Sequence, residues 1–149
     1  MAEWTDVYKL QYERIAQHEN QRLAFSSLVI AITTGVLAFI SSESKPISSP
    51  FQFLLLISLL LTINITAIVF ISKSRYWIKF HQERAKELLT KFSPEISDII
   101  KSIEKTNSDK DKFRRPTLQK HIHLIIIAIT LFYALNYSWP YITQLICCK

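Results

Sequence analysis

Three long stretches of this sequence contain no Asp, Glu, Lys or Arg, and they constrain the fold more than any other feature. They cover residues 23–42, 46–72 and 121–148. A helix rises about 1.5 Å per residue, so roughly 20 apolar residues cross a hydrocarbon core of about 30 Å. Each stretch reaches that length, and the remaining polar residues are too few to cover three such helices in water. The sequence therefore predicts an all-α membrane protein with three transmembrane helices.

The composition agrees with this prediction and argues against several classes of site. Hydrophobic residues make up 49% of the chain and charged residues 20%, whereas soluble domains carry about 25% charged residues. The single glycine, Gly35, excludes a Gly-rich phosphate-binding loop. The two cysteines, Cys147 and Cys148, are adjacent, which argues against a disulfide scaffold or a cysteine zinc site. They are interpreted either as an incidental end of an apolar helix or as the source of an intermolecular disulfide.

The distribution of basic residues predicts the orientation in the membrane. Residues 73–120 hold 13 of the 18 Lys and Arg residues, and the positive-inside rule places such a segment in the cytoplasm. The N-terminus is then also cytoplasmic, and the C-terminus lies outside. The first apolar stretch follows four acidic residues rather than a basic segment, so we interpret it as an uncleaved span and not as a signal peptide.

The chain is expected to be organised around its three spans, with a small cytoplasmic helical cap. The cap is smaller than an enzyme domain of usual size. In order along the sequence, the predicted segments are a cytoplasmic amphipathic helix (1–22), the first transmembrane helix (23–42), a short external loop (43–50), the second transmembrane helix (51–72), a cytoplasmic helical segment with a basic loop (73–119), the third transmembrane helix (120–145) and an external C-terminus (146–149).

Residue spacing predicts which faces of the cap helices pack. In the first helix this face consists of Tyr8, Tyr12, Ile15 and, two turns further on, Arg22. No Gly or Pro interrupts the second span as it continues into the cap, where the predicted face consists of Ile78, His81, Ala85, Leu88 and Phe92. Ser93 and Pro94 are expected to end that helix and to begin another. The apolar stripe of this further helix consists of Ile96, Ile99, Ile100 and Ile103.

Small residues recur at every fourth position of the first span, at Ser27, Ala31 and Gly35. Such rows let helices approach closely in lipid. This row is interpreted either as the contact between copies of the chain or as the face that packs on the other spans of the same chain. On the third span, Tyr133, Tyr137 and Tyr141 form a stripe that is interpreted as a packing face and an interface anchor.

The second span carries a row of hydroxyl side chains at Ser58, Thr62 and Thr66, and Asn64 points to a different face. In an oligomer these residues could line a narrow pore. The alternative is that they form hydrogen bonds between helices, because a polar amide within a span usually finds its partner inside the protein.

A basic cluster precedes the third span. It consists of Lys110, Lys112, Arg114, Arg115 and Lys120. Such clusters attract anionic lipid headgroups, and capture of a phosphate-bearing ligand is the alternative. His121 and His123 lie on nearly opposite sides of a helix and are not expected to share a metal ion. The sequence predicts no metal, no cofactor and no specific nucleic-acid site.

Enzymatic activity is not expected. No span contains an Asp, Glu, Lys or Arg residue, and no nucleophile, base and orienting residue are recognisable as a set in the sequence.

A further pattern lies near the N-terminus. Tyr8, Tyr12 and Glu13 form a Tyr-x-x-x-Tyr-Glu pattern, and the run HENQRL over 18–23 leads into the first span. Over residues 8–41 the chain resembles small bacterial membrane proteins of anti-phage operons, some of which are membrane-disrupting effectors of retron or cyclic-nucleotide defence systems. The resemblance implies a bacterial inner-membrane effector whose cytoplasmic part senses a signal or a partner.

Two functions from different classes follow as hypotheses. The first is a non-enzymatic, homo-oligomeric effector that perturbs the membrane or forms a pore and is gated by its cytoplasmic helices. The second is an accessory or scaffolding subunit of a larger membrane complex, which docks a soluble partner. The expected partners are the lipid bilayer, further copies of the chain, and a cytoplasmic protein or nucleotide signal.

The orientation can be tested by cysteine labelling of intact cells with a membrane-impermeant maleimide. In a background in which Cys147 and Cys148 are replaced by Ser, we expect Ser44→Cys to be labelled from outside and Ser108→Cys to be labelled only after the cells are permeabilised. The opposite pattern would reverse the assigned orientation.

Overall fold

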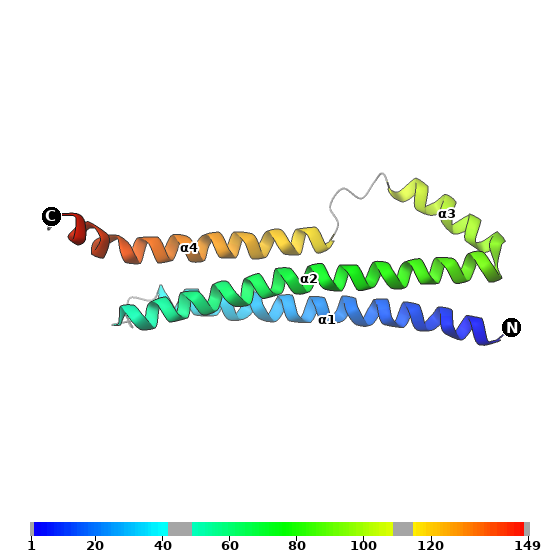
Figure 1. Ribbon diagram of the computed structural model, residues 1–149, viewed down its shortest axis with the longest axis horizontal. Helices are drawn as coiled ribbons and strands as arrows, with labels where there is room; N and C mark the ends of the chain where they lie inside the picture. The colour runs from blue at the N-terminus through cyan, green and yellow to red at the C-terminus, as the bar shows by residue number, and fades with distance from the viewer. Residues whose placement is uncertain (1, 42–48, 109–114, 148–149) are drawn as a thin grey trace. The chain divides into compact units, whose positions relative to one another are not determined.

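Four α-helices account for nearly all residues of the computed structural model, which describes residues 2–41, 49–108 and 115–147 (Figure 1). They are α1 (Ala2–Ile40), α2 (Pro50–Phe92), α3 (Pro94–Ser108) and α4 (Arg115–Cys147). The described residues contain no strand, and α1, α2 and α4 are each long and apolar enough to cross a membrane. The predicted all-α membrane fold with three transmembrane helices is therefore confirmed.

The first two spans continue into the charged sequence without a break. Helix α1 has 39 residues and α2 has 43, which correspond to about 58 Å and about 65 Å of helix. Both are much longer than a bilayer requires, because no proline interrupts either helix beyond its first turn. Helix α2 ends at Phe92, and α3 begins at Pro94, a residue that is well suited to the first position of a helix.

The chain divides into two compact units, and α1 and α2 contribute to both. The charged unit consists of residues 1–25 and 70–118, and the span unit consists of residues 26–69 and 119–149. Each unit is described separately below.

In the charged unit, α1 and α2 run antiparallel and touch along one seam. The rings of Trp4 and Phe92 stack at 5.8 Å, and the Ser74 hydroxyl donates a hydrogen bond to the backbone oxygen of His18 at 3.1 Å. Ile78 and Ala85 are buried between these contacts. The predicted packing face of α2 is therefore confirmed for Ile78 and Ala85. The buried leucine is Leu89 rather than Leu88, and Phe92 is 48% exposed although its ring stacks on Trp4.

The face of α1 in this seam differs from the prediction. Gln11 and Arg22 are buried, whereas Tyr12 is 50% exposed and contacts the hydroxyl of Tyr8 at 3.2 Å. The prediction holds for Ile15 and Arg22 and was wrong for Tyr12. The buried and half-buried positions follow the series Gln11, Ile15, His18 and Arg22, which includes polar residues. A search for apolar residues alone does not find that series.

Helix α3 packs on α2 through a polar contact. Ser97 is buried, and its hydroxyl lies 2.9 Å from that of Thr90. Of the predicted isoleucine stripe, Ile100 is half-buried. The other three members face away from α2 and are exposed: Ile96, Ile99 and Ile103.

In the span unit, α4 packs against both α1 and α2. Tyr137 stacks on Phe53 of α2 with ring centroids 3.8 Å apart, and the Tyr133 hydroxyl contacts that of Ser41 at the end of α1. The packing role predicted for the tyrosine stripe is confirmed for these two residues, and the side chain of Tyr141 lies outside the described part. The buried positions of α2 recur at steps of three and four residues: Phe53, Ile57, Leu60, Asn64 and Ala67.

Candidate functional site

A network of four polar side chains lies at the centre of the span unit. His123 of α4 is completely buried, with Nε2 2.9 Å from Ser26 Oγ of α1 and Nδ1 2.8 Å from Asn64 Oδ1 of α2. Asn64 is also completely buried and donates from Nδ2 to Thr33 Oγ1 at 2.9 Å. We call Ser26, Thr33, Asn64 and His123 the polar clasp, because together they join all three helices of the span unit.

The hydrogen bonds of the polar clasp have defined directions. Asn64 Nδ2 also donates to the backbone oxygen of Leu60 at 2.9 Å, and because a carbonyl oxygen can only accept, the amide nitrogen must face it. Asn64 Oδ1 is therefore the acceptor toward His123, so that Nδ1 carries the proton. His123 Nε2 is then an acceptor, and the Ser26 hydroxyl donates to it. Thr33 completes the hydrogen-bond network by donating from its hydroxyl to the Val29 carbonyl at 2.8 Å.

Two sequence features place these groups together. Ser26 and Thr33 are seven residues apart and thus share one face of α1, and Asn64 occupies one of the regularly spaced buried positions of α2. Residues 26–41 and 49–69 contain no charged residue, so His123 has only neutral partners on these two helices. Polar groups within a bilayer must be satisfied inside the protein, and here the three helices satisfy one another.

The order Ser26, His123, Asn64 matches that of a nucleophile, its base and an orienting residue. Two observations argue against acyl transfer at this position. Ser26 is only 1% exposed, so a substrate carbonyl cannot reach Oγ. Ser26 also lies in the middle of α1, where the backbone N–H groups are used within the helix and cannot stabilise an oxyanion. The geometry suits attachment of α4 to α1 and α2, with each interhelical hydrogen bond contributing about 0.6 kcal/mol.

The prediction that Asn64 lines a pore has to be corrected. It is completely buried within one chain, because its amide makes the hydrogen bonds between helices that were the alternative interpretation. Ser58, Thr62 and Thr66 are exposed, and their hydroxyls donate at 2.8 Å to backbone carbonyls of their own helix. A pore-lining role for these three stays a prediction.

The structure argues against one of the two interpretations of the small-residue row, namely packing within the same chain. Ser27, Ala31 and Gly35 are all exposed, and a Cβ atom at Gly35 would meet nothing within 4 Å. The row therefore does not pack on other helices of the same chain. The adjacent face does so instead, through Ser26, Val29, Thr33 and Leu37, because these residues supply both the polar clasp and the apolar contacts around it. Contact between copies through the row stays a prediction.

The basic cluster lies largely outside the described residues. Lys110, Lys112 and Arg114 fall in the segment that is not described, and Arg115 begins α4 without a described side chain. Lys120 is half-buried in α4. Among the side chains that are described, no three His, Cys, Asp or Glu residues are grouped as metal ligands would be.

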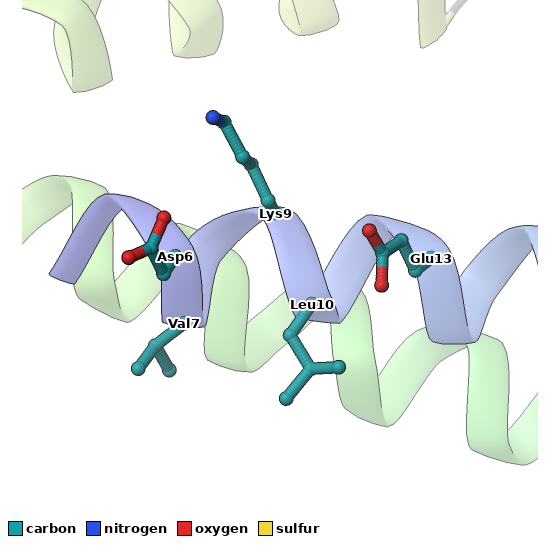
Figure 2. A pocket seen from close by; sticks show the side chains of 5 residues that line it. All are labelled: Asp6, Val7, Lys9, Leu10 and Glu13. Carbon is teal, nitrogen blue, oxygen red and sulfur yellow. The ribbon is translucent and has the colours of Figure 1, made fainter. Parts of the chain in front are cut away.

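A shallow groove lies on the surface of α1, and it offers no catalytic arrangement. Figure 2 shows its five lining residues, all from one helix: Asp6, Val7, Lys9, Leu10 and Glu13. Val7 and Leu10 point to one side, and Lys9 points to the other.

Sequence reasoning missed the roles of Ser26 and His123. A usable signal was present, because His123 belongs to a series on α4 with steps of three and four residues that continues through Ile126 and Thr130, both of which are buried. A histidine in such a series within an apolar stretch indicates a buried partner.

No protein-family model, no curated protein and no solved structure matches this chain. The function is therefore argued from the arrangement of its own residues.

The polar clasp can be tested by a double-mutant cycle. We expect His123→Leu to lower the free energy of unfolding by about 1–3 kcal/mol, because Ser26 and Asn64 lose their partner inside the bilayer. Asn64→Leu combined with His123→Leu should cost less than the sum of the two single changes. The measurement is reversible unfolding in mixed micelles.

His121→Leu is the matched control, because His121 is an exposed histidine two residues away on the same helix. This substitution should change the free energy by less than about 0.5 kcal/mol. Equal losses for the two histidines, or strictly additive losses in the cycle, would contradict the assigned network.

Proposed function

We propose that this protein is a non-enzymatic integral membrane protein that assembles into a homo-oligomer and permeabilises a bacterial inner membrane as a defence effector. Its N-terminus and charged unit lie in the cytoplasm, and its C-terminus lies outside. The observation that carries the proposal is that two rows of small and hydroxyl side chains remain uncovered on the span unit. These are the small-residue row on α1 and the hydroxyl row on α2.

The two rows occupy the same level of the helix pair. Helices α1 and α2 are antiparallel, and Thr33 is hydrogen-bonded to Asn64. A residue two positions after Thr33 on α1 therefore lies level with the residue two positions before Asn64 on α2, and the reverse holds in the other direction. Gly35 is then level with Thr62, and Ala31 is level with Thr66.

The small-residue row supports assembly because lipid chains gain little from contact with it, whereas a second helix can approach its backbone closely. Ser27 adds to this argument. It is exposed, and within the described residues its hydroxyl makes no hydrogen bond. A neighbouring copy would cover Ser27 and could supply a partner for its hydroxyl.

The hydroxyl row supports the permeation path. Ser58, Thr62 and Thr66 already use their protons on the backbone of α2, so the remaining lone pairs of their oxygens face outward. Oxygen lone pairs arranged in a row suit water and cations better than lipid chains. The resemblance of residues 8–41 to membrane-disrupting effectors agrees with this role. Gating by the charged unit is part of the proposal, since α1 and α2 run without a break from that unit into the spans.

Gly35→Leu tests the proposal. No atom lies where a new side chain would begin, so the fold of a single chain should be retained. Induced expression of the wild-type protein should depolarise bacteria. We expect the variant to cause at least tenfold less depolarisation, because the leucine side chain holds neighbouring copies apart. The measurement is dye fluorescence, together with cross-linking to report the oligomer.

Ala128→Leu provides the matched control, because Ala128 is an exposed small residue on α4 that belongs to neither row. It should behave as the wild type does. If wild-type protein forms no oligomer, or if Gly35→Leu and Ala128→Leu depolarise cells equally, assembly through the small-residue row is excluded.

The second candidate function, an accessory subunit that docks a soluble partner, is favoured by one observation. Ile96, Ile99 and Ile103 form an apolar stripe on the outer side of α3 and are 48%, 59% and 54% exposed. A contiguous apolar stripe on a charged helix is typical of a protein-binding surface.

Ile99→Glu distinguishes the two functions. An accessory subunit should lose a partner that co-purifies with the wild type, because a charge would be buried in the contact. A pore-forming oligomer should still depolarise cells after this change. Pull-down and dye fluorescence on the same variant report the two outcomes separately.

A further inference from the structure

Two histidines face each other across the seam of the charged unit. His18 of α1 and His81 of α2 stack with ring centroids 5.7 Å apart and an interplanar angle of 25°. Trp77 stacks on His18 at 6.5 Å. Both histidines are half-buried, and His81 lies nine residues beyond the end of the second span at residue 72, so water can reach the pair. We call His18 and His81 the imidazole pair.

The hydrogen-bonding partner of the imidazole pair is neutral. His81 Nδ1 lies 2.8 Å from Gln11 Oε1, and Gln11 is only 5% exposed. Gln11 Nε2 faces the Val7 carbonyl at 3.4 Å, which can only accept, so the amide oxygen is the group that faces His81. His81 therefore donates from Nδ1, and no carboxylate is hydrogen-bonded to its ring among the described side chains.

The charged groups around His81 all have the same sign. On α1 these are His18 and Arg14, and on α2 it is Arg84. No described side chain of α3 acts on His81. Burial, followed by the positive charges of His18, Arg84 and Arg14, lowers the pKa of His81 below its ordinary value of 6.5. The packed helices thus bind fewer protons at His81 than separated helices would, so the seam weakens as the pH falls below about 6.5 and is unaffected well above it.

Little apolar packing opposes this effect at the level of the imidazole pair. The buried residues nearest to it along the seam are Gln11, Arg22, Ser74, Ile78 and Ala85. Only one of these is a large apolar residue. Contacts of this kind open more easily than a well-packed apolar core.

We propose that the imidazole pair is an acid-sensitive switch, in which protonation of His81 separates α1 from α2 within the charged unit. A charged His81 ring, stacked on His18 with Arg14 and Arg84 close by, would add a positive charge to a contact that already holds two. The aromatic stack and the bond to Gln11 hold the seam when His81 is neutral. The switch acts within one chain and does not require assembly of several copies.

Hydrogen exchange of the full-length chain tests this proposal. The protein is reconstituted in phosphatidylcholine nanodiscs, whose headgroups do not titrate between pH 7.5 and 5.0. After correction for the intrinsic effect of pH, we expect residues 8–22 of α1 to exchange at least tenfold faster at pH 5.0 than at pH 7.5. Residues 26–38, in the span unit, should show no change and serve as the internal reference.

His81→Phe identifies the group responsible. Phenylalanine retains the stack on His18 but cannot be protonated. The acid response should fall to less than threefold. His121→Phe, which removes an exposed histidine from the span unit, should keep the tenfold response.

Two outcomes would overturn the proposal. One is a wild-type protein whose residues 8–22 exchange equally at both pH values. The other is a His81→Phe variant, with helicity checked by circular dichroism, that keeps the full acid response. If that variant does not fold, the wild-type comparison between the two pH values decides the question.

Discussion

Inside a bilayer a polar side chain has no water to bind, and this constraint organises the span unit. His123 could not be buried in α4 unless its two ring nitrogens found partners, and Ser26 and Asn64 supply them at 2.9 Å and 2.8 Å. Asn64 is satisfied in turn by Thr33 and by the backbone carbonyl of Leu60. The rotation of each helix about its axis is thereby determined, since a change of one residue in register would leave a buried polar group without a partner.

That rotation also determines what the outer surface offers. With Ser26 and Thr33 turned inward, the neighbouring row of Ser27, Ala31 and Gly35 faces outward. With Asn64 turned inward, the hydroxyls of the α2 row face outward in the same way. The proposed assembly and permeation path use surfaces that are available only because the polar clasp occupies other faces of these helices.

The charged unit meets a different constraint, because water is available to it. Its seam tolerates Gln11, Ser74 and two stacked histidines in place of a continuous apolar core. The environments of His123 and His81 therefore differ. His123 is enclosed by neutral partners from three helices, whereas His81 is accessible and surrounded by positive groups. The proposed response to pH belongs to the second environment, because water reaches it.

Much of the fold was predictable from the sequence. The three uncharged stretches indicated the spans, and the steps of three and four residues after Ile78 indicated the packed face of α2 in the charged unit. The candidate site was not predictable to the same extent. Asn64 was recognised as a polar group in a span, but its partners Thr33 and His123 lie 31 and 59 residues away along the chain. Spacing within one helix carries no information about contacts over such separations.

The sequence alone determined that this chain is helical and carries three helices long and apolar enough to cross a membrane, because hydropathy and charge act locally along the chain. The tertiary structure decided which polar residues face one another. It turned Asn64 toward His123 rather than toward a pore, and it left Gly35 uncovered rather than packed. The physical reason is that a hydrogen bond between helices depends on the rotation of both partners at once, and that rotation is set only when all three helices pack together.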